Sequence, residues 1–154
     1  MIEKGGKELI SGNGKSSINS MLAALLSRGI GTVGTFFYAT KMGDIGTKEA
    51  EYFGFICIIF GILFLVWGIL AVVSISKTKI KVYEDRIEGA GTCGLGIGTS
   101  NFLLTINDQV SIEVRGRNLI VLGPGVRYWV YVKNATEIQS AVFQLKNLRR
   151  PVEK

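Results

Sequence analysis

The stretch FGFICIIFGILFLVWGILAVVSIS, residues 53–76, decides the fold of this chain because it contains no charged residue. As an α-helix with a rise of roughly 1.5 Å per residue it would be about 36 Å long, which is enough to cross a bilayer with some tilt. Each central Leu, Ile, Phe or Val favours insertion by about 0.3–0.6 kcal/mol. The sequence therefore predicts a transmembrane helix over residues 53–76.

Basic residues follow this stretch directly. Lys77, Lys79 and Lys81 come next in a chain of 154 residues whose formal net charge is +6. Positive charge beside a span is typical of the cytoplasmic side, where anionic headgroups attract it. We expect these lysines to contact the surface of the inner (cytoplasmic) membrane, with the C-terminal part in the cytoplasm. This placement of charge favours a membrane contact over nucleic-acid binding.

A second helix is predicted upstream, in INSMLAALLSRGIGTVGTFFYAT, within residues 17–40. Its larger apolar residues share one face at helical spacing. Arg28 near its middle would cost about 2.5–3.5 kcal/mol in a bilayer, roughly cancelling the apolar contributions. With a connecting loop over residues 41–52, these segments make a membrane region over residues 17–76.

Small residues predict that the two helices pack together. Close helix approach in lipid requires small side chains on both surfaces. Six residues supply them, the first three recurring every seventh position: Gly54, Gly61, Gly68, Ser27, Gly31 and Thr35. We expect a helical hairpin, which the charge bias of the loops also favours. The alternative is a single span with the upstream helix lying in the membrane interface.

Residues 1–16 are predicted to be a flexible polar tail. Their SGNGKSS stretch resembles a phosphate-binding loop, but Leu9 stands where that pattern needs its first glycine. Ser16 or Ser17 is available to cap the first membrane helix.

Alternating apolar and polar residues replace the helical pattern after residue 77. Six short strands are predicted, with turns at RGRN and GPG. A helix then begins near Asn134, a candidate N-cap with Glu137 three residues on. Its apolar stripe is Ile138, Ala141, Val142, Leu145 and Leu148. Pro151 ends the helix and leaves residues 151–154 as a tail.

The segments IKVYEDRIEG, FLLTINDQVSIEVRGRNLIVL and YVKNATEI resemble the pleckstrin-homology (PH) superfold, specifically the bacterial PH-like domains found on small membrane proteins. For residues 77–150 the resemblance implies an α+β domain, an antiparallel β-barrel or meander of six to seven strands capped by one C-terminal helix. Since six strands are evident where the fold usually has seven, the missing strand is expected to be short or hidden in the glycine-rich residues 89–98. The acidic first turn does not match the basic phosphoinositide site of the family, so no specific phosphoinositide binding is expected.

Catalytic chemistry has few candidate residues in this chain. There is no His, which removes the commonest general base and metal ligand. The acids Glu84, Asp85 and Glu88 fit a solvated hairpin turn better than a cation site. Gly89, Gly91 and Gly94 match a dinucleotide fingerprint, but no helix is predicted to follow them. We expect no enzyme activity, no cofactor and no metal.

One predicted strand, VRYWVYVK, carries a candidate partner interface. If Tyr128, Val130 and Val132 face the core, the opposite face holds Arg127, Trp129, Tyr131 and Lys133. Trp, Tyr and Arg dominate binding interfaces. The alternative is that Trp129 and Tyr131 pack under the glycine-rich segment.

These features predict a membrane-anchored binding or scaffold protein whose partner is another protein or a second copy of the chain. The alternative is a small accessory or modulatory subunit of a membrane transport or secretion complex, acting through its transmembrane helices.

Overall fold

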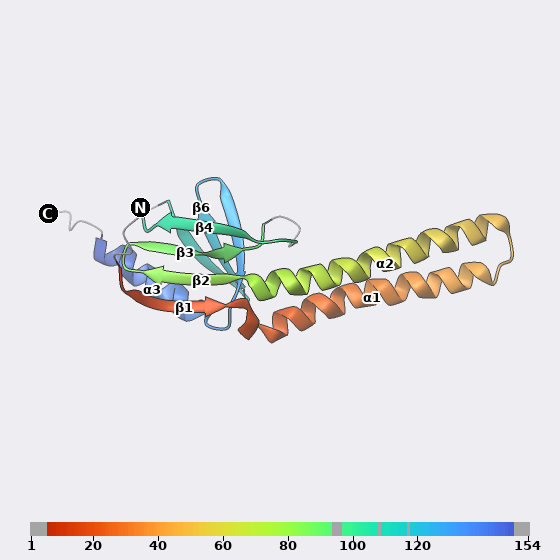
Figure 1. Cartoon of the computed structure of the whole chain (residues 1–154), viewed down its shortest axis with the longest axis horizontal. Helices are drawn as coiled ribbons and strands as arrows, with labels where there is room; N and C mark the ends of the chain where they lie inside the picture. The colour runs from red at the N-terminus through yellow and green to blue at the C-terminus, as the bar shows by residue number, and fades with distance from the viewer. Residues whose placement is uncertain (1–5, 94–96, 108, 117, 150–154) are drawn as a thin grey trace. The chain divides into compact units, whose positions relative to one another are not determined.

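A computed structural model describes residues 6–93, 97–107, 109–116 and 118–149 (Figure 1). The chain divides into two compact units. The helical unit is Met21–Val73, and the β unit combines the described residues up to Ser20 with those from Ser74 onward. Parts of the predicted tails (residues 1–5 and 151–154) and of the glycine-rich segment (residues 94–96) lie outside the described residues.

The helical unit is built from α1 (Ile18–Gly43) and α2 (Lys48–Lys77), both long and apolar enough to cross a membrane. The predicted loop over residues 41–52 is shorter in the structure, because α2 begins at Lys48. Thr47 caps this helix by accepting a hydrogen bond from the Ala50 N–H at 3.3 Å. Glu49 and Glu51 in the first turn also favour a helix start here.

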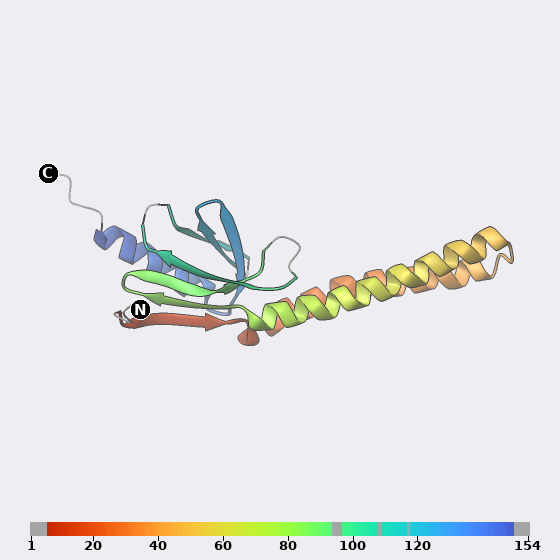
Figure 2. The same cartoon turned by 45° about the horizontal axis from the view of Figure 1, so that its top comes forward.

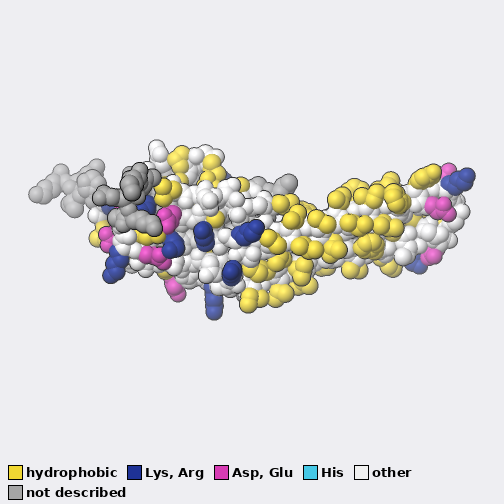
Figure 3. All heavy atoms as spheres, in the orientation of Figure 1, with side chains coloured by type: hydrophobic (Ala, Val, Ile, Leu, Met, Phe, Trp, Pro, Cys, Tyr) yellow, Lys and Arg dark blue, Asp and Glu magenta, His cyan; other side chains and the backbone are white. Residues whose placement is uncertain are grey.

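Large apolar side chains cover much of the visible surface of α1 and α2, whereas charged side chains gather near the connecting turn (Figure 3). Leu26, Ile30 and Phe55 are each more than half exposed. A continuous apolar surface of this kind is unusual on a soluble monomer and marks a membrane or protein contact.

Two antiparallel sheets and one helix form the β unit (Figures 1 and 2). The first sheet is β1 (Glu8–Asn13), β2 (Lys79–Tyr83), β3 (Arg86–Gly91) and β4 (Ser100–Thr105), paired in that order. The second is β5 (Ser111–Arg115), β6 (Asn118–Gly123) and β7 (Val126–Tyr131). The final helix, α3 (Ala135–Arg149), contacts both β1 and β5. Inward-facing residues of both sheets and α3 make one core.

The N-terminal segment is not the flexible polar tail that the sequence predicted, because residues 8–13 form strand β1. Asn13 pairs with Lys79 and Gly12 with Ile80 in an antiparallel ladder. Ile10 packs against the core. The strand absent from the sequence prediction is therefore supplied from before the helices, whereas residues 89–91 of the glycine-rich segment belong to β3.

The residues after β1 turn sharply into α1. Asn13 caps a 3₁₀ turn, Gly14–Ser16, by accepting a hydrogen bond from the Ser16 N–H at 3.2 Å. The Gly14 N–H donates to Thr78 O at 2.7 Å. Glycine is required at this position, because a Cβ would overlap the carbonyl oxygen of Ile75. The SGNGKSS stretch is thus the end of a strand and a turn.

The apolar stripe of α3 differs from the predicted one at its C-terminal end. Ile138 and Val142 are buried and Leu145 packs on the core, but Leu148 is 82% exposed. Arg149 lies four residues after Leu145 and takes the corresponding position in the last turn. Its guanidinium donates to Ile106 O at 3.2 Å and to Glu84 O at 2.7 Å. These bonds tie the end of the helix to two loops.

Candidate functional site

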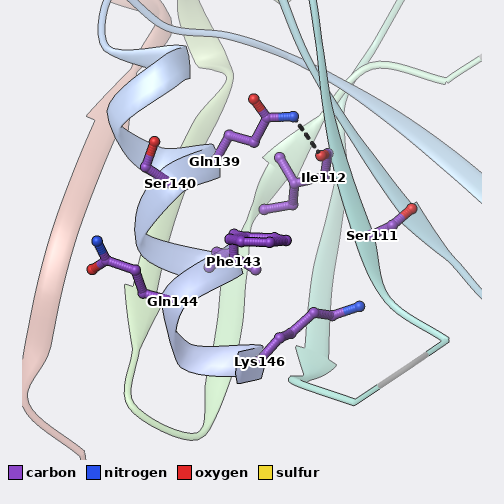
Figure 4. Close-up of a pocket in the computed structure, with 8 residues that line it drawn as sticks. Ser111, Ile112, Gln139, Ser140, Phe143, Gln144 and Lys146 are labelled. Atoms are coloured by element: carbon purple, nitrogen blue, oxygen red, sulfur yellow. Dashed lines mark hydrogen bonds between the residues drawn. The ribbon is translucent and has the colours of Figure 1, made fainter. Parts of the chain in front are cut away.

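A groove of about 510 Å³ lies between α3 and β5 (Figure 4). Its floor is apolar, made by Ile112, Val142 and Phe143. Four residues point from α3 towards β5 or into the core because they recur at helical spacing: Gln139, Val142, Phe143 and Lys146. Figure 4 shows Ser140 and Gln144 pointing away from the strand. Phe143 is 64% exposed, which is unusual for a large aromatic side chain in a groove.

Strand β5 is the edge of its sheet. It pairs with β6 alone among the described strands. The Gln139 Nε2 donates to Ile112 O at 3.0 Å, so the carbonyl of Ile112 points away from β6 (Figure 4). Along a strand of an antiparallel pair, successive residues direct their N–H and C=O groups alternately towards and away from the partner strand. The N–H and C=O of Val114, two residues after Ile112, therefore also point away from β6. Within the groove the outward carbonyl of Ile112 is thus already bonded to α3, and the edge groups of Val114 lie beyond the residues that line it.

The predicted interface on β7 is only partly exposed. Arg127 and Lys133 are exposed, whereas Trp129 and Tyr131 are half-buried. The backbone of Trp129 exchanges two hydrogen bonds of 2.9 Å with Thr92. Thr78 Oγ1 accepts from the Tyr131 N–H at 3.2 Å. Contacts from outside its sheet thus cover the outer edge of β7, which makes β7 a poorer place than β5 for adding a strand.

The three predicted membrane-surface lysines divide into two groups. Lys77 and Lys79 are exposed. Lys81 instead forms an ion pair of 2.7 Å with Glu8 of β1. The sequence could not reveal this pair, because β1 was not predicted. Lys77 and Lys79 therefore remain the candidates for contact with headgroups.

The ion pair between Glu8 and Lys81 shifts the pKa values of both groups. The hydrogen bond from Lys81 lowers the pKa of the Glu8 carboxyl, and the same bond raises the pKa of the Lys81 ammonium. Nearby, a hydrogen bond of 2.7 Å to Glu88 raises the pKa of the Tyr83 phenol. A carboxyl whose pKa is lowered on folding stabilises the fold above its unfolded pKa, and this contribution disappears as the pH falls through the folded value.

We expect β1 to loosen in acid. Amide hydrogen exchange of β1 should be slower in the wild-type chain than in Glu8→Gln at neutral pH. This difference should shrink as the pH falls through the lowered pKa of Glu8. Glu113→Gln on β5 is the control and should leave β1 unchanged. A difference between wild type and Glu8→Gln that stays constant across the acid range would contradict the assignment.

The acidic first turn is occupied by contacts within the fold. Arg86 lies 3.1 Å from Asp85 and 4.0 Å from Glu88, and its guanidinium stacks on Tyr83. Among the residues that the structure describes, no cluster of three or more His, Cys, Asp or Glu is placed to hold a metal ion.

The glycine face of α2 lies against α1 in the helical unit. Cβ atoms built at Gly54, Gly61 and Gly68 would come within 3.2, 2.8 and 3.4 Å of α1 atoms belonging to Ala39, Thr35 and Arg28. From α1, a Cβ atom built at Gly31 would lie 3.5 Å from the ring of Phe64. Ser27 is exposed and not brought into this contact. Arg28, one residue further along α1, takes its place.

Arg28 is the unusual residue of the helical unit. Its guanidinium lies 4.7 Å from the ring centroid of Trp67, a cation–π contact. Nη1 donates to Ala24 O and Ser27 Oγ, each at 3.2 Å. Nε of Arg28 and Nε1 of Trp67 are buried and have no hydrogen-bond partner among the residues that the structure describes. The sequence indicated the charge of Arg28 but not its contact with Trp67.

No protein-family model matches the sequence, and neither a curated protein nor a solved structure matches it. The function of the chain is therefore inferred from the geometry of the groove, the lysines and the helix pair.

Proposed function

We propose that this chain is an integral protein of the inner membrane that presents a PH-like binding domain on the cytoplasmic side and holds a protein partner at the membrane surface. Its activity is binding and not catalysis. The observation that carries the proposal is the groove between α3 and the edge strand β5, with its apolar lining and its exposed Phe143.

Strand pairing supports the proposed membrane topology. β1 precedes α1 and β2 follows α2, and the two strands pair directly. The N-terminus of α1 and the C-terminus of α2 are therefore held on the same side of any bilayer. If α2 crosses, α1 must cross back, which favours the hairpin over a single span. Exposed Lys77 and Lys79 at the end of α2 favour the cytoplasm as that side.

The groove suits an extended segment of a partner protein. A peptide that adds a strand to a sheet edge gains main-chain hydrogen bonds, while neighbouring pockets select its side chains. Ile112 and Phe143 provide an apolar contact, and Lys146 at the rim favours an acidic residue nearby. The seven antiparallel strands and the final helix among the described residues also support the PH-like assignment.

Peptide selection tests this function. A random decapeptide library is panned against the full chain in lipid nanodiscs, and the enriched peptides are measured against two variants. Phe143→Ser should weaken binding by about tenfold or more, as expected for an aromatic anchor. Leu148→Ser changes another exposed apolar residue of α3 and should leave binding unchanged. If no peptide is enriched, or if Phe143→Ser binds as well as the wild type, the groove is not the binding site.

A second function, an accessory subunit that acts through its helices, is favoured by one observation. Arg28 and Trp67 place unsatisfied hydrogen-bond donors within the apolar helix pair. Such groups in membrane helices mark functional contacts by default.

A further inference from the structure

Arg28 lies close to the middle of the apolar helix pair. It packs against Gly68, about one helical turn from the centre of the charge-free residues 53–76. It is also ten residues from the start of α1, which corresponds to about 15 Å. That is about half the thickness of a hydrocarbon core. If the helices span the bilayer as proposed above, this guanidinium lies far from both headgroup layers.

The contacts of Arg28 within the chain do not satisfy it. Nη1 is bonded and Nε is buried without a partner. Nη2 donates no hydrogen bond to any residue that the structure describes, and it is not among the buried unpaired atoms. It therefore reaches the surface of the helix pair. The face of Trp67 stabilises the positive charge but accepts none of these hydrogen bonds.

The two helices do not supply an anion at this depth. α1 contains no Asp or Glu, and the acids of α2 are Glu49 and Glu51 in its first turn. Glu51 is about 25 Å along the helix from the level of Gly68. A second copy inserted in the same orientation would present the same residues at the same depths. Neither the monomer nor a homodimer places a carboxylate beside Arg28.

We propose that Arg28 is the docking point for a transmembrane helix of a different protein that carries an aspartate or glutamate at the same depth. The proposal rests on the membrane insertion stated under the proposed function, but not on the groove. A carboxylate beside the guanidinium offsets the free-energy cost of placing a positive charge in the bilayer. It can also accept hydrogen bonds from the Nη2–H groups of Arg28. Arg28 is thus a specificity-determining residue for a membrane partner.

The test uses the full chain in neutral lipid vesicles, with energy transfer to synthetic transmembrane peptides. The probe is a Leu/Ala helix with one central Asp, compared with matched helices carrying Asn or Ala there, or Asp moved two turns towards one end. We expect the central-Asp helix to bind about tenfold more tightly than the Ala helix. Arg28→Gln should remove that preference, and Arg28→Asp should transfer it to a peptide with a central Lys.

Other results would overturn the proposal. Equal binding of the four peptides, or an unchanged preference in Arg28→Gln, would show that Arg28 does not recognise a carboxylate. A preference for the displaced Asp would place the guanidinium near the surface, where a lipid phosphate is its partner. Phe143→Ser serves as the control and should leave peptide preference unchanged. The two tests can fail independently. If peptide selection finds no ligand for the groove but the central-Asp preference is present, only the proposed function is wrong; if the groove binds peptides but the Asp preference is absent, only this proposal is wrong.

Discussion

Replacing Leu119 with alanine is expected to lower the free energy of unfolding of the β unit by about 2–5 kcal/mol. Leu119 is fully buried on β6, the central strand of the second sheet, and belongs to the core shared by both sheets and α3. The substitution removes transfer free energy and leaves a cavity that surrounding strands fill only in part. Because a small domain is stabilised by only about 5–15 kcal/mol in total, this loss is large.

Pulse proteolysis in urea, applied to the full chain in nanodiscs, measures this effect. The midpoint of unfolding should shift to clearly lower urea in Leu119→Ala. Leu148→Ala makes the same change at a residue that is 82% exposed, and it should shift the midpoint little. Similar midpoints for the two variants would contradict the packing described for β6.

Replacing Gly61 with leucine is expected to separate α1 from α2. Even the first atom of a side chain at Gly61 would lie 2.8 Å from Thr35 Oγ1 and 3.2 Å from the ring of Phe36. Overpacking typically costs about 1–3 kcal/mol, and a leucine adds three further carbons. Close backbone approach, which drives helix association in lipid, would also be lost.

Distance measurements between spin labels on the two helices, in the full chain, test this expectation. Gly61→Leu should broaden the distance distribution and shift it to longer values. Gly34→Leu is the matched control, because a Cβ at Gly34 meets no atom within 4 Å. An unchanged distribution in Gly61→Leu would mean that the glycine face does not hold the hairpin. If partner association then survives the separation of the helices, the accessory-subunit function is also excluded.

The helical unit was the more predictable part of the fold. Length and the absence of charge predict α2 directly, since few structures other than a membrane span accommodate residues 53–76. The seven-residue recurrence of Gly54, Gly61 and Gly68 identifies the face that meets α1. The sequence did not correctly predict every residue of α1 that faces α2. Ser27 and Arg28 are adjacent, and helical spacing alone does not decide which of the two points at α2.

Long-range pairing explains what the sequence did not predict. Apolar and polar residues alternate only weakly over Glu8–Asn13, and the partner strand follows both helices. No local pattern therefore predicts β1. The Glu8–Lys81 ion pair was missed for the same reason. The groove depends on which side of α3 the sheets leave uncovered. The predicted stripe includes buried Val142 and omits exposed Phe143, but helical spacing cannot show that Phe143 lies beside β5.

The separation of β1 from β2 also sets an order of events during synthesis. About 65 residues, including both long helices, must be translated between Asn13 and Lys79. At about 5–20 residues per second, β1 waits roughly 3–13 s before its partner strand exists. During that interval both long helices are synthesised, so β1 has no partner strand until the whole helical unit has been translated. Completion of the first sheet thus depends on prior synthesis of the helical unit.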